Sequence, residues 1–185
     1  MVCHAVQLSF ITALAVGDVI RSFLDPMDHY WFKWPNDVLI NHYKVAGILL
    51  ETEVYNRISY TIIGIGVNIF SAPQVFDSSY PATALVWHTN KALTVKHILT
   101  CLLHRFAYWY SLWVKEGFSP VRTEWIRHAL GWRQRLVVQI DDITTVQGRF
   151  QAVGDDGSLG LHSFDDQTIH WIKKGVVVFP LQESE

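Results

Sequence analysis

The sequence predicts an α/β (α+β) protein: a mixed sheet flanked by helices, followed by a small β-barrel. Three observations predict this fold class. Residues 4–24 carry apolar side chains at helical spacing, residues 30–69 contain long apolar stretches of strand composition, and after Gly131 short strands alternate with turn residues. We therefore place a domain boundary near Gly131, with a first domain at residues 1–131 and a second at residues 132–185.

The composition limits the classes of protein to which this chain can belong. Half of the 185 residues are hydrophobic, which is enough to build a core, and the net charge of −2 lacks the basic excess typical of nucleic-acid binders, so we expect no DNA partner. Cys3 and Cys101 lie far apart without zinc-ligand spacing, which fits a reducing cytoplasm. We expect no membrane span, because no apolar run reaches about 18 residues, and the N-terminus lacks the basic region of a signal peptide.

The first helix and the strands after it can be placed from local patterns. The helix at residues 4–24 ends at Pro26, which cannot continue the hydrogen-bond ladder. An aromatic strand follows at Tyr30–Trp34. Val38–Ile40 and Val45–Glu53 are predicted as the two arms of a hairpin, with its turn at Asn41–Tyr43. The next strand, Ile58–Ile69, is apolar on both faces in its middle, which predicts a central strand covered on each side.

The second half begins with loop and helix signals. Residues 71–92 are loop-like, with a short helix starting at Thr83–Leu85. Thr94 is a suitable N-cap for a helix to about Glu116, and Pro120 suits the first position of another helix that ends near Leu130. Five short strands separated by aspartate- and glycine-rich turns then predict the barrel, at Arg135–Ile140, Thr145–Val153, Ser158–His162, Thr168–Ile172 and Val176–Phe179.

Charged residues stand unusually close together in Lys33-Trp34-Pro35-Asn36-Asp37 and at Lys44. Lysines that flank strands are usually solvated strand ends, but Lys33 lies within an aromatic strand, where a buried ammonium group needs an anionic partner. Asp37 is the nearest partner, and a substrate phosphate is the alternative. In the second case Lys44 would stabilise charge that develops on phosphorus.

Three polar residues each have more than one interpretation. In one interpretation, Asn36 is a turn residue that hydrogen-bonds its neighbouring backbone. In the other, its carboxamide binds the edge of adenine or a metal-bound water. Asp37 is a turn residue, a partner of Lys33 or a Mg²⁺ ligand. Asn68 follows Gly64 and Gly66 and either caps the strand end or faces a ligand. The nine histidines show no metal-site spacing, and Ser71, Ser78 and Ser79 lack the setting of a nucleophilic serine.

In order and spacing, three motifs resemble the central motifs of the biotin protein ligases. The motifs are Lys33-Trp34-Pro35-Asn36-Asp37, Lys44-Val45-Ala46-Gly47-Ile48-Leu49 and Gly64-Ile65-Gly66-Val67-Asn68. The predicted helices and the C-terminal barrel also fall where that family has them. The resemblance implies a class II synthetase-like catalytic domain followed by an SH3-like barrel.

The resemblance also implies a reaction and a set of roles. Biotin would be activated by ATP to biotinyl-AMP and transferred to a lysine of a biotin carboxyl carrier domain, with Mg²⁺ bridging the phosphates. Lys44 would be catalytic and would contact the biotin carboxylate and the α-phosphate, beside the adenylate-binding glycines Gly47, Gly64 and Gly66. Nucleotide-binding roles would fall to Lys33, Trp34, Asn36 and Asn68, and Asp37 would support Mg²⁺.

The family pattern also contains parts that this chain does not match. Its Ser-Thr-Asn type motif and its Gly-Arg-Gly-Arg-rich loop have no counterpart here, so we expect sheet edges to be exposed and the chain alone to make biotinyl-AMP inefficiently. Phe179 stands about where some members have arginine. The alternatives are a catalytically incomplete binding subunit and a lipoate-type acyl-adenylate ligase. A homodimer paired beside Ile58–Ile69, as in some relatives, is also open.

Overall fold

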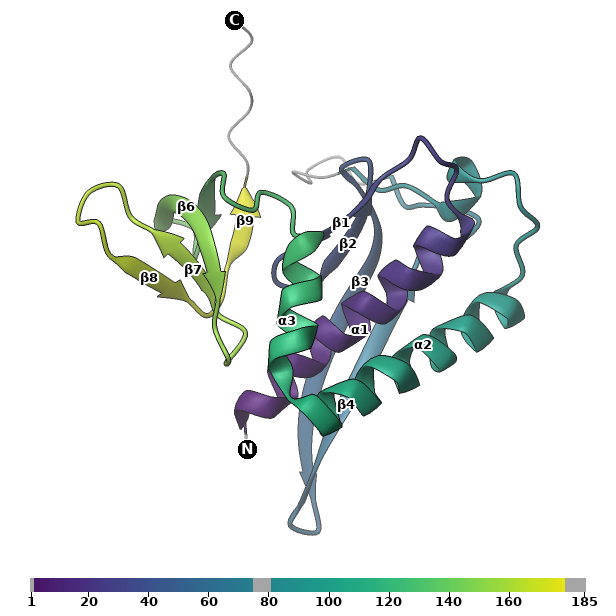
Figure 1. Cartoon of the computed structure of the whole chain (residues 1–185), viewed down its shortest axis with the longest axis horizontal. Helices are drawn as coiled ribbons and strands as arrows, with labels where there is room; N and C mark the ends of the chain where they lie inside the picture. Colours follow the sequence, from purple (N-terminus) through teal and green to yellow (C-terminus); the bar gives the residue numbers. More distant parts are fainter. Residues whose placement is uncertain (1, 75–80, 179–185) are drawn as a thin grey trace, which may run out of the picture.

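The computed structural model describes residues 2–74 and 81–178, with side chains from Ala5 onward. In chain order the elements of the first part are a long helix, four strands, a 3₁₀ turn and two helices: α1 (Val2–Phe23), β1 (Tyr30–Lys33), β2 (Asp37–Ile40), β3 (Tyr43–Tyr55), β4 (Ile58–Val67), η1 (Leu85–His88), α2 (Val95–Glu116) and α3 (Phe118–Arg127). Five strands follow: β5 (Arg135–Gln139), β6 (Thr145–Val153), β7 (Leu159–His162), β8 (Ile169–Ile172) and β9 (Val176–Val178) (Figure 1).

The helix α1 forms the centre of the molecule. Phe10, Ile11 and Ile20 are buried, and the helix packs against α2, α3 and the first sheet, as the predicted helical spacing requires. The expectation that no segment is long and apolar enough to span a membrane was wrong, because Ala5–Phe23 is long and apolar enough by length and composition. However, 72% of that segment is buried inside the protein, which is how a core helix behaves.

The first sheet confirms the α/β class and corrects one prediction. Its order is β1-β2-β3-β4, with antiparallel pairing throughout, and parallel pairing is limited to isolated bridges such as Lys44 with Ala82. The strand β4 was predicted to be central, yet among the described residues it pairs only with β3. Ile58, Tyr60 and Ile62 are exposed. The apolar pattern shows what the strand is suited to bury and cannot show whether a neighbour lies beside it.

The helices α2 and α3 follow their predicted signals closely. The Thr94 side chain accepts a hydrogen bond from the His97 backbone N–H at 3.2 Å, and Gly117 ends α2 with a φ of 79°. The helix α3 begins at Phe118, earlier than predicted, so Pro120 lies in its first turn rather than at its first position. Proline is tolerated there because the first backbone N–H groups of a helix have no intrahelical acceptor.

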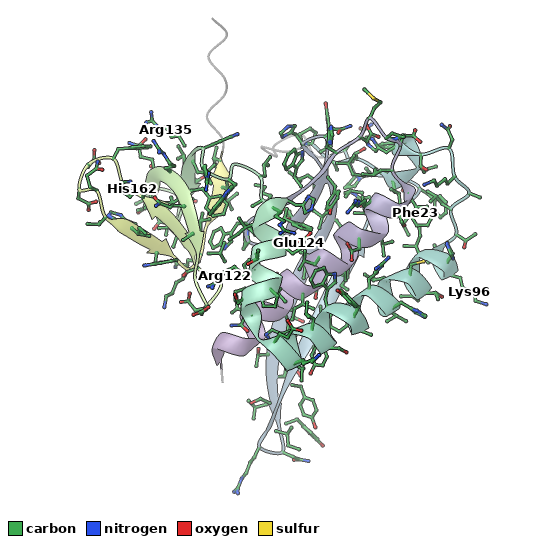
Figure 2. The ribbon with its side chains drawn as sticks, viewed as in Figure 1. Phe23, Lys96, Arg122, Glu124, Arg135 and His162 are labelled. Atoms are coloured by element: carbon green, nitrogen blue, oxygen red, sulfur yellow. The ribbon has the colours of Figure 1, made fainter. Side chains whose placement is uncertain are left out.

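The C-terminal strands form one antiparallel sheet that rests on the helices. The five predicted strands are present, in the order β8-β7-β6-β5-β9. Arg122 of α3 lies at the junction (Figure 2), where its Nη1 donates to Val153 O at 3.3 Å and to Asp155 Oδ1 at 2.8 Å. The barrel closure and the domain boundary at Gly131 stay predictions. The predictions about Ser78, Ser79, Phe179 and the Cys3 side chain lie outside what the structure describes.

Candidate functional site

The first sheet brings Lys33, Asp37 and Lys44 together on one face. In the strand ladder Lys33 pairs with Asp37, and Asp37 pairs with Gly47. Because Phe32 and Val38 alternate with these residues and point into the core, the charged side chains project from the opposite face. Lys44 Nζ lies 2.5 Å from Asp37 Oδ1. The register therefore assembles two ammonium groups around one carboxylate.

Glycines leave the sheet bare beside this cluster. A Cβ atom at Gly47 would lie 3.2 Å from Lys44 Cε and 3.5 Å from Asp37 Oδ1, so the lysine side chain runs across the glycine. Gly47 pairs with Gly66, and Leu49 pairs with Gly64. A Cβ at Gly66 would come no closer than 4.0 Å to another atom, the Gly47 carbonyl oxygen. The predicted surface free of side chains is present, and Lys44 stands at its margin.

The electrostatics of the cluster favour an anion. Lys33 is only 6% exposed, so its interpretation as a solvated strand end was wrong. Burial lowers the pKa of Lys33 below its ordinary value of 10.5; Asp37 opposes this effect and Lys44 adds to it. The ammonium group of Lys44 carries a positive charge at the edge of this cluster. The Lys44 side chain is 42% exposed, so that charge is accessible at Lys44.

The lowered pKa of Lys33 predicts how stability depends on pH. Between the folded-state pKa and 10.5 the unfolded chain binds more protons, so the free energy of unfolding of the wild type should rise with pH relative to that of Lys33→Met. Tyr30, whose pKa burial raises to about 12, is present in both proteins and cancels. Urea unfolding from pH 7 to pH 10.5 measures the difference, and a difference independent of pH would contradict the assignment.

The two asparagines that were predicted to face adenine hold the backbone of β3 in this structure, and their contact with adenine stays a prediction. Asn36 Nδ2 donates to the Ile48 carbonyl at 2.7 Å, and Ile48 N–H donates to the Asn36 carbonyl at 2.9 Å. Asn68 Nδ2 donates to the carbonyls of Thr83 at 3.1 Å and Lys44 at 3.4 Å. The capping interpretation of Asn68 is therefore the one that the structure supports. Both amides fix the strand segment that carries Lys44 and Gly47.

Trp34 does not lie on the surface of the site. Its side chain is 4% exposed, and Nε1 donates to the Gly157 carbonyl at 2.9 Å, across to the turn between β6 and β7. A buried indole with its only donor occupied cannot present itself to a nucleotide in this structure. In this structure Trp34 joins the first sheet to the C-terminal sheet, and its nucleotide contact stays a prediction.

Sequence reasoning missed a hydrogen-bonded network behind Lys44. Thr83 Oγ1 lies 2.7 Å from His88 Nε2, and His88 Nδ1 lies 2.9 Å from Asp28 Oδ2. The Thr83 backbone N–H donates to the Lys44 carbonyl at 2.9 Å, so the network fixes the segment that supports Lys44. Thr83 is buried and does not present a nucleophile. No spacing signal could have found the network, because its members come from separate segments of the chain.

The residues do not fit a resident Mg²⁺ site. No group of three or more histidine, cysteine or acidic side chains in the described part of the chain could hold a metal ion. Asp37 offers a single carboxylate, which is already paired with Lys44 and neighbours Lys33. A magnesium ion at this place would have to be bound mainly through phosphates.

One cleft of about 900 Å³ lies away from this cluster, between α3 and the C-terminal sheet. Its charged side chains are already paired: Arg122 with Asp155 at 2.8 Å, and Lys173 with Asp156 at 3.3 Å. The Lys33–Asp37–Lys44 cluster is the better candidate site, because the exposed ammonium group of Lys44 lies beside bare backbone.

Comparison with known proteins gives one consistent result. A model of the Biotin/lipoate A/B protein ligase family matches residues 4–68. A biotin–[acetyl-CoA-carboxylase] ligase of Paracoccus denitrificans is 33% identical over 159 residues, which are 84% of this chain and 66% of that protein. The bifunctional ligase/repressor of Bacillus subtilis is 31% identical over 85% of this chain and 48% of its own length.

Solved structures agree on the fold. The biotin protein ligase of Aquifex aeolicus superposes with a TM-score of 0.76 at 21% identity, covering 94% of this chain and 73% of that one. The same ligase in complex with biotin and ATP superposes with a TM-score of 0.74, also at 21% identity, covering 93% of this chain and 70% of that one. The chain thus spans about half to two thirds of the length of the curated relatives described above.

Proposed function

We propose that this chain, which belongs to the biotin protein ligase family, serves the ATP-dependent activation of biotin to biotinyl-AMP and its transfer to a lysine of a biotin carboxyl carrier domain. The observation that carries the proposal is the Lys44–Asp37 pair beside the bare strip of Gly47 and Gly66, inside the segment that the family model matches. A strip without side chains lets a ligand approach the backbone, and Lys44 meets it with a positive charge.

The proposed chemistry has two steps, and Lys44 can act in both. In the first, a carboxylate oxygen of biotin attacks the α-phosphorus of ATP, and the bond from that phosphorus to the bridging oxygen breaks to release pyrophosphate. Negative charge grows on the α-phosphate oxygens during this step. An ammonium group held beside them stabilises that charge more than it stabilises the ground state. Lys33, which is buried and pairs with Asp37 in the strand ladder, lies close enough to Lys44 for the two charges to interact.

In the second step the neutral ε-amine of the carrier lysine attacks the carbonyl carbon of the mixed anhydride. The carbon–oxygen bond to the phosphate breaks, AMP leaves with the electron pair, and the amine loses a proton to give the amide. Charge again grows on the phosphate oxygens. Lys44 is suited to stabilise the departing AMP, because its Nζ lies over Gly47 rather than inside the core.

Asp37 has a positioning role in this proposal. Its Oδ1 lies 2.5 Å from Lys44 Nζ and directs the ammonium group along the strip of glycines. The Mg²⁺ that the resemblance implies would arrive with the triphosphate, and no step here depends on a protein ligand for it. The homodimer, the absence of DNA binding and the cytoplasmic location stay predictions from the sequence.

The direct test incubates the purified protein with biotin and MgATP and follows pyrophosphate release and biotinyl-AMP by mass spectrometry. We expect slow formation of adenylate with biotin, in keeping with the inefficient activity expected of the chain alone, and none with lipoate. Adenylate formed from lipoate would overturn the choice of substrate in favour of a lipoate-type ligase. Tight binding of added biotinyl-AMP without turnover would indicate the alternative of a binding subunit, and absence of both would contradict the proposal.

A further inference from the structure

Lys44 stands at an irregular point of β3. In the ladder Leu39 of β2 pairs with Lys44, and the residue before Leu39 pairs with Ala46. Val45 is therefore an extra residue of β3, which makes a β-bulge. A bulge interrupts the regular pairing of two strands, so pairing with β2 alone holds this part of β3 less firmly than a regular ladder would. The position of Lys44 depends on further contacts.

The segment at residues 81–83 supplies these contacts. The backbone N–H of Lys44 donates to the Pro81 carbonyl at 2.9 Å, and the carbonyl of Lys44 accepts from the Thr83 backbone N–H at 2.9 Å. Asn68 Nδ2 is a second donor to the Lys44 carbonyl, at 3.4 Å. Both backbone groups of Lys44 are thus bound to this segment, and a shift of the segment would move Lys44 with it.

The side chain of Thr83 ties this segment to His88 and Asp28. Thr83 Oγ1 lies 2.7 Å from His88 Nε2, and His88 Nδ1 lies 2.9 Å from Asp28 Oδ2. Because a carboxylate can only accept, the ring proton lies on Nδ1, and Nε2 of the neutral ring accepts the hydroxyl hydrogen of Thr83. Thr83 is 4% exposed, and the side chains of His88 and Asp28 are 15% and 20% exposed, so water competes little for these hydrogen bonds.

The chain of hydrogen bonds returns to the turn that precedes Lys44. Asn41 Nδ2 donates to Asp28 Oδ1 at 2.5 Å, and Asn41 Oδ1 accepts from the His29 backbone N–H at 2.9 Å. Asn41 has a φ of 46°, in the left-handed region that asparagine tolerates better than most residues. The network therefore holds the chain three residues before Lys44 as well as at Lys44 itself.

We propose that Asp28, His88 and Thr83 are positioning residues for the reaction, which hold the Lys44 ammonium group at the margin of the glycine strip. They act on Lys44 through its backbone rather than on the ligand. The inference rests on the proposed function, because it concerns the step in which Lys44 stabilises charge on the phosphate oxygens. A lysine that is held in place before the reaction loses less freedom in the transition state than a mobile one.

Thr83→Val tests the network with the smallest change, because it removes the hydroxyl group and keeps the backbone N–H that binds Lys44. We expect biotinyl-AMP to bind about threefold to tenfold more weakly, the effect of losing one hydrogen bond. Adenylate formation should slow by about tenfold or more, because a reacting geometry depends steeply on position. Thr83→Ser keeps the hydroxyl group and should stay within about twofold of the wild type. Thr123→Val removes a hydroxyl group that donates to the Ser119 carbonyl at 2.9 Å within α3, and this matched control should have no effect.

Double-mutant cycles separate positioning from support of the fold. In the Lys44→Ala background, Thr83→Val should change the affinity for biotinyl-AMP by no more than about twofold, because the group that Thr83 positions is gone. Effects that multiply would overturn the inference in favour of a purely structural role. His88→Asn keeps an N–H for Asp28 but is too short to reach Thr83. It should therefore cause the same loss as Thr83→Val and add nothing to it, and full affinity of both variants would contradict the inference.

Hydrogen exchange tests the network apart from any ligase activity. In Thr83→Val the backbone N–H groups of Thr83 and Lys44 should exchange about tenfold faster than in the wild type, while those of β7 should not change, and unchanged exchange would overturn the inference. If the chain binds no biotinyl-AMP, or if Lys44→Ala binds it as the wild type does, it is the proposed function that fails. If Lys44→Ala weakens binding while Thr83→Val leaves binding and adenylate formation unchanged, the network has no positioning role and the proposed function stands.

Discussion

Replacing Lys44 by alanine is expected to weaken the binding of biotinyl-AMP by about tenfold to a hundredfold, the usual value of a hydrogen bond to a charged group. Any adenylate formation should fall further, by about 10²–10³-fold, because charge stabilisation is greater in the transition state than in the bound ligand. The reason is local: Lys44 is the exposed cation at the margin of the glycine strip. Calorimetry with biotinyl-AMP and pyrophosphate release measure the two effects separately.

Matched variants separate charge from packing at this position. Lys44→Arg keeps the charge and should retain more affinity than Lys44→Ala, whereas Asp37→Asn keeps the lysine and removes its partner at 2.5 Å. Lys96→Ala, on the exposed side of α2, is the control for loss of a surface lysine. Unchanged affinity of Lys44→Ala with an unchanged circular dichroism spectrum would remove Lys44 from the site.

Local patterns were enough to predict most of the fold. Periodicity marked α1, because the side chains it buries recur at the helical period, and Thr94 and Gly117 marked the ends of α2 through backbone chemistry within one turn. Such signals lie within a few residues of one another. The grouping of Lys33, Asp37 and Lys44 was also predictable, because a hairpin brings nearby residues into register.

What could not be predicted depends on residues distant in the chain. Among the described residues β4 pairs only with β3, and the composition of a strand does not show which strands lie beside it. Asn68 was left with two interpretations because its acceptors, the carbonyls of Lys44 and Thr83, are 24 and 15 residues away in the sequence. The His88 network joins three segments, and each of its members looks ordinary alone. Polar side chains that serve the backbone therefore resemble ligand-binding residues in a sequence.

Trp34 gives the sharpest test of that distinction, and the second large effect that we expect. Trp34→Ala should lower the free energy of unfolding by about 3–5 kcal/mol, the usual cost of truncating a buried tryptophan. The reason is that the indole fills the core and pairs with the Gly157 carbonyl, 123 residues away. For a chain of 185 residues, each kcal/mol corresponds to about 2–4 °C in Tm. Urea unfolding and thermal melting measure the loss.

A graded series shows whether the indole serves the fold or the ligand. Trp34→Phe keeps most of the ring but leaves the Gly157 carbonyl without its donor, so it should cost about 1–3 kcal/mol. Trp87→Ala removes an indole that is 60% exposed and should change stability by no more than about 0.5 kcal/mol. If Trp34 joins the two sheets, Trp34→Phe will bind biotinyl-AMP as the wild type does at temperatures where both are folded. A large loss of affinity at unchanged stability would instead restore Trp34 to the nucleotide site, because a contact with ligand and a contact with Gly157 cannot both use the one N–H of the indole.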